Sequence, residues 1–192
     1  DNIQGVDFTV TGRETVVKVR YPKSADCRGA WLTIKVPHKA KLKVNTVSAA
    51  LTIVECQGGI EANTVNGTQN MYKVDGAIKA KTINGGLRVS GGSGLIDVDT
   101  TSGRVDLHYC QGKVLVNTVS GRVDVTSEQI NELKVKTTSG TINYRGGFLA
   151  KGSYDFKSVS GHIHLRLPDG TKANFTTKSM SGMTRTNLIS SN

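Results

Sequence analysis

The chain of 192 residues has few aromatic side chains, 5% of its residues, and only 3 prolines. A core with so few aromatic rings has to be built from valine, isoleucine and leucine in regular layers. No run of apolar residues approaches the roughly 20 that span a bilayer, so we expect no transmembrane segment. The chain shows no signal peptide. Because it begins at Asp1 rather than Met, we expect any targeting segment to have been removed with the preceding residues.

The sequence also lacks the spacing of apolar side chains that is typical of amphipathic helices. Apolar and polar residues alternate instead in short runs closed by glycine, as in Gly103-Arg-Val105-Asp-Leu107. Such runs are typical of half-buried β-strands. We therefore expect an all-β fold.

Glycine, by contrast, is abundant at 22 residues and recurs in Ser-Gly or Asn-Gly steps at a nearly fixed period. The period is 18 residues in the middle of the chain and 19 to 21 residues towards its end. A period this short indicates one supersecondary unit stacked on copies of itself. We expect the turn glycines to supply positive φ at sharp corners. They are Gly67, Gly85, Gly103, Gly121, Gly140, Gly161 and Gly182, with Ala49 in the same register.

Each repeat contains two short strands, which cannot bury an apolar face alone, so successive coils must stack with equivalent strands parallel. We predict a single-domain parallel β-helix (β-solenoid) of about eight coils, right-handed, over residues 41–188. Residues 1–40 lack the glycine repeat and contain Trp31, and we expect them to form a β cap over the open end. Residues 189–192 are expected to form a disordered tail.

The stack predicts two columns of polar side chains that can hydrogen-bond along the axis. One column is made of threonines and continues in serines: Thr46, Thr64, Thr82, Thr100, Thr118, Thr137, Ser158 and Ser179. The other lies at the turn: Ser48, Asn66, Asn84, Ser102, Ser120, Ser139, Ser160 and Ser181. The enlarged late coils add aromatic residues that could close the far end, namely Phe148, Tyr154, Phe156 and Phe175.

The three cysteines are Cys27, Cys56 and Cys110, without the spacing of a zinc site. Cys56 and Cys110 occupy equivalent positions three coils apart. At about 4.8 Å per coil they are separated by ~14 Å, too far for a disulfide. We therefore expect free thiols, while a Cys27–Cys56 bridge stays open.

Two other patterns in the sequence could indicate a metal site. His162 and His164 alternate with apolar residues and should point outward, and we favour two exposed polar side chains over a metal site because no acidic residue lies beside them. The run Gly91–Gly94 begins like a calcium-binding nonapeptide, but Ile96 stands where that motif needs aspartate. We interpret the run as a turn, and we expect no metal and no cofactor.

Outward positions of the coils carry a small patch of mixed charge. Its members are Arg88, Arg104, Asp106, Arg122 and Asp124, and the outward histidines His162 and His164 extend this candidate surface. Stacked carboxylates can be catalytic, as in β-helix enzymes that act on acidic polysaccharides. With arginines alternating beside them, we favour a ladder of ion pairs.

The formal net charge is +10, and much of the excess lies in residues 13–43, with nine basic and two acidic residues. Such a segment attracts polyanions. The alternative is a solvated face of alternating strands. The candidate polyanion-binding residues are Lys35, Lys39, Lys41 and Lys43. No specific nucleic-acid motif is present.

The repeat text resembles that of a bacterial family with "T-x-S-G-x-[IV]-x-[VL]" repeats, which carries an adhesin label and is formally a domain of unknown function. Matching segments include Asn63-Thr-Val-Asn-Gly67, Asp99-Thr-Thr-Ser-Gly103 and Lys136-Thr-Thr-Ser-Gly140, and the resemblance covers about residues 30–185. It implies a single-chain parallel β-helix on exported or membrane-tethered proteins. It carries over no catalytic residue.

We therefore expect a non-enzymatic protein of the cell surface or envelope that acts as an adhesin or scaffold for an unknown ligand, a glycan or a protein. Two alternatives stay open: a β-helix carbohydrate-active enzyme acting on acidic polysaccharide, and a self-assembling structural scaffold.

Overall fold

A computed structural model describes residues 5–11, 14–20, 32–168, 178–179 and 184–186. Contacts within the chain divide it into two compact units, residues 1–36 and residues 37–192. The described residues contain no helix whose length and hydropathy would let it cross a membrane.

The first unit contains one β-hairpin. Strands β1 (Gly5–Thr11) and β2 (Glu14–Arg20) pair antiparallel, with Val6 opposite Val19 and Thr11 opposite Glu14. Trp31, the residue expected to anchor a cap, lies outside the described residues. The cap formed by residues 1–40 stays a prediction.

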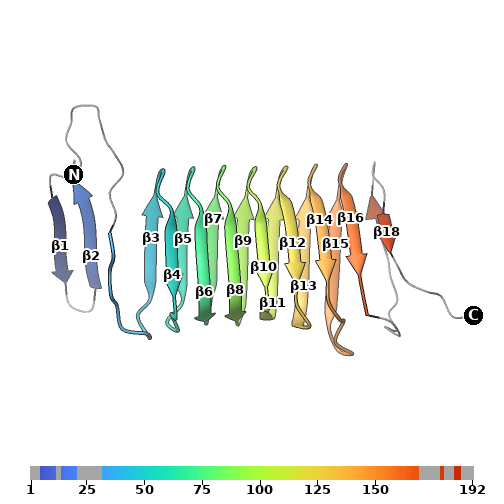
Figure 1. Ribbon diagram of the computed structural model, residues 1–192, viewed down its shortest axis with the longest axis horizontal. Coiled ribbons are helices and arrows are strands. Elements are labelled where there is room, and N and C mark those ends of the chain that lie inside the picture. The colour runs from blue at the N-terminus through green and yellow to red at the C-terminus, as the bar shows by residue number, and fades with distance from the viewer. Residues whose placement is uncertain (1–4, 12–13, 21–31, 169–177, 180–183, 187–192) are drawn as a thin grey trace, which may run out of the picture. The chain divides into compact units, whose positions relative to one another are not determined.

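The second unit is a β-solenoid made of two parallel sheets of eight strands each (Figure 1). The odd-strand sheet comprises β3 (Leu42–Thr46), β5 (Ile60–Thr64), β7 (Ile78–Thr82), β9 (Leu95–Thr100), β11 (Gln111–Thr118), β13 (Gln129–Thr137), β15 (Ser153–Ser158) and β17 (Lys178–Ser179). The even-strand sheet comprises β4 (Leu51–Val54), β6 (Gln69–Asp75), β8 (Leu87–Ser93), β10 (Val105–His108), β12 (Arg122–Thr126), β14 (Thr141–Arg145), β16 (His162–Arg166) and β18 (Thr184–Thr186).

The chain alternates between the two sheets, so each coil contributes one strand to each. The result is about seven complete coils followed by the short strands β17 and β18. The predicted all-β parallel solenoid is confirmed. The tail predicted for residues 189–192 lies outside the described residues.

Alternate residues of both sheets point inward and form one continuous core. Val89, Val98, Leu107 and Val116 have no exposed surface. The strands stack in register, so that Val105 lies between Leu87 and Val123. Burying each such side chain contributes about 2 kcal/mol, and the core is made of aliphatic layers, as the scarcity of aromatic residues predicted.

The turn glycines are needed for a different reason from the one expected. None of those in the described residues, from Gly67 to Gly161, is among the glycines with positive φ. A Cβ built on Gly103 would instead overlap the carbonyl oxygen of Gly85 in the preceding coil, and the equivalent overlap occurs at each of these turns. The backbones of successive turns are therefore in contact, and only a residue without a side chain fits.

The threonine column forms the predicted axial hydrogen bond at its first step, but its later members have a different role. Thr46 and Thr64 are hydrogen-bonded hydroxyl to hydroxyl at 2.7 Å, along the axis. From Thr82 onward the hydroxyl accepts a hydrogen bond from the turn glycine three residues later, as between Gly85 N and Thr82 Oγ1 at 3.0 Å. These threonines therefore close the turn within their own coil.

The outer polar column forms axial hydrogen bonds, as predicted. Asn84 Nδ2 donates to Asn66 Oδ1 at 3.2 Å, and the hydroxyls of Ser139 and Ser160 lie 3.3 Å apart. Ser181, at the end of this column, lies outside the described residues.

At the other corner of each coil, where the chain leaves the even-strand sheet, some non-glycine residues adopt positive φ. Glu55, Lys73 and Tyr109 have φ of 55°, 50° and 53°, and Gly91 occupies the same place in its coil with φ 71°. The interpretation of Gly91–Gly94 as a turn is wrong in part, because Gly91 to Ser93 belong to β8. Strand β8 bends at this left-handed residue and the chain then passes into β9.

The enlarged late coil is filled by aromatic side chains. Tyr144 is buried and lies against Phe148, Tyr154 and Phe156, with ring centroids 5.4 to 6.2 Å apart. The Tyr154 hydroxyl donates to the Ile130 carbonyl at 2.6 Å. These rings pack against the core, while Phe175 lies outside the described residues.

Candidate functional site

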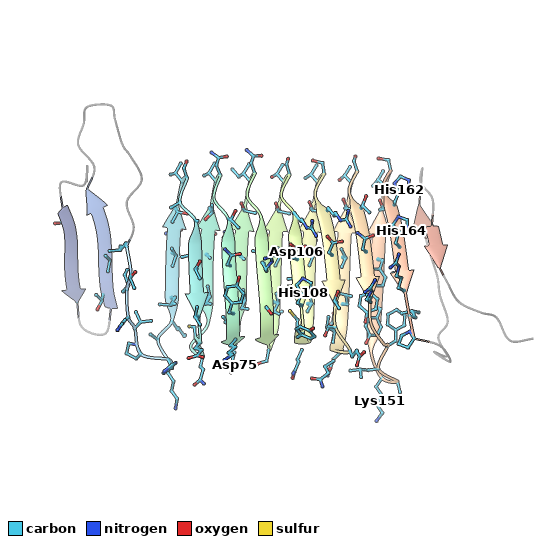
Figure 2. The ribbon with its side chains drawn as sticks, in the orientation of Figure 1. Asp75, Asp106, His108, Lys151, His162 and His164 are labelled. Atoms are coloured by element: carbon cyan, nitrogen blue, oxygen red, sulfur yellow. The ribbon has the colours of Figure 1, made fainter. Side chains whose placement is uncertain are left out.

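The predicted surface residues lie on the outer face of the even-strand sheet. Strand register places Arg88, Asp106, Asp124, Asn143 and His164 in one column along the axis. The residues two positions before Asp106, Asp124, Asn143 and His164 are Arg104, Arg122, Thr141 and His162. We call the outer surface of β8, β10, β12, β14 and β16 the even face; Asp106, His108, His162 and His164 are labelled in Figure 2.

The first part of the even face is a ladder of ion pairs. Asp106 contacts Arg104 Nε at 2.7 Å and Arg88 Nη2 at 3.3 Å. Asp124 contacts Arg104 Nη2 and Arg122 Nε, each at 2.9 Å. Arg104 thus bridges two coils, and its hydrogen bond and charge interaction with Asp106 raise the pKa of its guanidinium group. The arrangement is the ion-pair ladder that the sequence favoured.

Asp106 lies at an outward position of the even face, but its carboxylate is shielded. The side chain points outward but only 8% of it is exposed, whereas the arginines beside it are more than half exposed. The arginine side chains cover the carboxylate. Asp124 is similarly shielded at 16% exposure and also accepts a hydrogen bond from Asn143 at 2.6 Å.

The last part of the even face is cationic. His162 and His164 lie along β16 with their rings parallel, at an interplanar angle of 4° and a centroid distance of 6.2 Å (Figure 2). His162 is exposed and His164 half-buried, so both point outward as predicted. Arg145 and Arg166 are register partners on β14 and β16, and both are exposed. We call these four residues the cationic cluster.

Sequence reasoning missed Arg145 and Arg166. Each lies five residues after its turn glycine, Gly140 or Gly161, and this shared position was the available signal. Among the residues that the structure describes, no group of three or more His, Cys, Asp or Glu side chains could hold a metal ion.

The outer face of the odd-strand sheet is balanced in charge. Lysines and acids from adjacent coils pair along the axis, with Lys81 3.1 Å from Asp99 and Lys113 2.9 Å from Glu132. Hydrogen bonds from Lys134 and Lys113 lower the pKa of Glu132. This face therefore neutralises most of its own charge.

The candidate lysines near the N-terminus do not form one described cluster. Lys35 belongs to the first unit, whereas Lys39, Lys41 and Lys43 belong to the solenoid. Lys43 is 3.2 Å from Glu61, and Lys39 borders a hollow of about 620 Å³ that also contains Glu55.

A shallow groove of about 520 Å³ follows the corner of the solenoid that carries the threonine column, across the first five coils. We call this corner the threonine corner. It is lined by the threonine column from Thr46 to Thr118 and by the side chains of Val65, Ile83 and Val119. The sequence reasoning did not identify it, because the apolar residue between threonine and serine is replaced by threonine in some coils.

Cys56 and Cys110 are free thiols, as predicted, and both are buried. Burial raises the pKa of the Cys110 thiol to about 11. Cys110 is therefore protonated and inaccessible at neutral pH. Cys27 lies outside the described residues.

Comparison with known proteins identifies a family but no individual relative. No curated protein and no solved structure matches the chain. One family model, described as Toastrack DUF4097, matches residues 3–189, which is nearly the whole chain. The chain therefore belongs to the Toastrack family of domains of unknown function, DUF4097.

Proposed function

We propose that this protein is a non-enzymatic binding protein of the cell surface or envelope, an adhesin or scaffold whose solenoid holds charged side chains in fixed positions for a ligand. The observation that carries the proposal is the register of the even face, where each coil contributes one polar side chain to a column along the axis. Repeats of this kind create extended binding surfaces.

The rigidity of the support favours recognition of an extended ligand. Inner strands of both sheets are paired on two sides, and their inward residues form one buried core. Side chains on paired strands are held at about 4.8 Å per coil. A ligand therefore meets preorganised groups, which reduces the entropy lost on binding.

The geometry of the two aspartates favours binding over catalysis. Both carboxylate oxygens of Asp106 contact arginines, and those of Asp124 contact arginines and Asn143. A general acid or base must exchange a proton with substrate, which here would require breaking several of these contacts. Catalysis by these two aspartates would therefore require the ion-pair ladder to rearrange first.

The proposal is tested by adding fluorescently labelled protein to cell envelopes and to extracellular polymers. We expect saturable binding without release of reducing ends during prolonged incubation. Release of reducing ends by the wild type, lost in a D106N/D124N variant, would replace this proposal with the enzyme alternative. Concentration-dependent filaments in light scattering, without ligand binding, would favour the self-assembling scaffold.

A further inference from the structure

The cationic cluster lies in a stretch without acidic residues. Strands β14, β16 and β18 contain no aspartate or glutamate, and neither do residues 156–168. Register also places Arg185 of β18 beside His164. Along the axis, the even face thus changes from an ion-pair ladder to a stretch that carries arginines and histidines.

The arginines of the cluster differ from those of the ladder in their partners. Arg88, Arg104 and Arg122 each contact an aspartate. For Arg145 and Arg166, no ion pair is found within the part of the chain that the structure describes.

The other sheet shows that this difference is specific to the even face. In the same coils, Lys134 lies 2.7 Å from Glu132, and Lys157 lies 2.8 Å from Asp155. In these coils, the described part of the odd-strand sheet therefore pairs lysines with acids, whereas Arg145 and Arg166 of the even-strand sheet form no ion pair with a described residue.

We propose that the cationic cluster binds a linear acidic polysaccharide running along the solenoid axis, and binds it more tightly below neutral pH. This inference rests on the proposed function and names the class of its ligand. Arg145 and Arg166 lie on adjacent coils, about 4.8 Å apart in backbone position, and contact successive acidic groups. Thr141 and Asn143, on the same face, supply hydrogen-bonding groups for sugar hydroxyls.

The composition of the even face favours a polysaccharide over a nucleic acid. Proteins that bind single strands of nucleic acid stack the bases on aromatic side chains. The outward residues of β12, β14 and β16 include no phenylalanine, tyrosine or tryptophan. Cations, hydroxyls, an amide and imidazoles instead suit a polymer of acidic sugars.

The pH dependence follows from the surroundings of the two histidines. Strand β14 presents Thr141, Asn143 and Arg145 on the same face, and β16 itself presents Arg166. The acid on the same column, Asp124, is occupied by Arg104, Arg122 and Asn143. Histidine is the side chain that ordinarily gains charge between neutral and mildly acidic pH.

Protonation and binding are therefore coupled. Two protonated imidazoles add positive charge beside the two arginines, and a polyanion binds this charge more tightly than it binds neutral rings. By linkage, a ligand that prefers the protonated form binds more tightly as the pH falls. The charge available to the ligand increases from the two arginines to all four members of the cluster.

The test compares three double variants of the full chain by calorimetric titration with heparin and with a carboxylate-only polyuronate, at pH 7.5 and 5.5. R145Q/R166Q removes the arginines and H162Q/H164Q the histidines. K136Q/K157Q is the matched control, since these exposed lysines are register partners in the same region of the odd-strand sheet. Thermal unfolding confirms that each variant is folded, and R145K/R166K should retain binding if charge suffices.

We expect R145Q/R166Q to bind about tenfold more weakly at both pH values, the effect of losing two partly exposed charge contacts. H162Q/H164Q should bind like the wild type at pH 7.5 but lose the increase at pH 5.5. The control should stay within about twofold. Comparing heparin with the polyuronate distinguishes recognition of sulfate groups from recognition of carboxylate groups.

Equal losses in R145Q/R166Q and the control would overturn the inference, because binding would then follow net charge alone. Loss only in a K39Q/K41Q variant would place the polyanion at the N-terminal lysines. Tighter binding of oligo-dT than of either polysaccharide would overturn the ligand class. If neither polymer binds but the labelled protein still binds cell envelopes, the inference fails while the proposed function stands.

Discussion

Gly103 lies directly over the carbonyl oxygen of Gly85, so closely that a Cβ on Gly103 would overlap that oxygen. The same relationship links Gly121 to Gly103 and Gly140 to Gly121. The recurring glycine therefore sets how closely the coils approach at the threonine corner.

Replacing Gly103 with alanine should destabilise the protein by more than about 3 kcal/mol, because the clash is with backbone rather than with a flexible side chain. Gly147→Ala is the control, since a Cβ there meets nothing within 4 Å, and it should change stability by less than about 0.5 kcal/mol. Urea unfolding measures both. Similar small effects would show that the turns can separate without cost.

The core contains one polar side chain that the period alone would make aliphatic. Gln69 is fully buried and in register with Leu51 and Leu87; its Nε2 donates to the Lys81 carbonyl at 2.8 Å, but its Oε1 has no described partner. Gln69→Leu should raise the free energy of unfolding by about 1 kcal/mol, because an unsatisfied buried oxygen is removed. Gln69→Ala should lower it by leaving a cavity. A leucine variant less stable than the alanine variant would contradict this explanation.

The ion-pair ladder should contribute to stability mainly through its shielded carboxylate. Asp106→Asn should cost about 2 kcal/mol, less than a fully buried pair would, because Arg88 and Arg104 are half exposed and can be rehydrated. Glu61→Gln, which removes an exposed partner of Lys43, should cost clearly less, because water screens an exposed ion pair. Chemical denaturation of the two variants provides the comparison, and equal costs would mean that shielding has no effect.

Cys110 should be unreactive in the folded protein. Its thiol is buried, and burial raises its pKa to about 11, so little thiolate exists at neutral pH. In a C27S/C56S variant, we expect a thiol reagent to label Cys110 only at the rate of unfolding, and quickly in urea. Rapid labelling of the native protein would show that the coil around Cys110 opens readily.

The period of the sequence predicted the architecture well, because each turn glycine marks one coil and fixes which residues share a column. The register that places Asp106 over Arg88, and His164 beyond Asn143, follows from the count of residues after each glycine. It also placed Cys56 and Cys110 at equivalent positions three coils apart, too far from each other for a disulfide.

The features that were missed depend on contacts between coils. The count could not show that Gly103 meets Gly85 rather than adopting positive φ, because both explanations place glycine at the same position. The shielding of Asp106 depends on the conformations of two long arginine side chains. Arg145 and Arg166 stood at a shared position in the sequence, but their importance depends on which cations the described acids pair with in three dimensions.

The measurement that tests the central claim most directly is the salt dependence of polysaccharide binding. Each cation that contacts the polymer releases counterions, so removing Arg145 and Arg166 should reduce the slope of log affinity against log salt by about 2. The account predicts this reduction for R145Q/R166Q and an unchanged slope for K136Q/K157Q. Identical slopes for the two variants would contradict it.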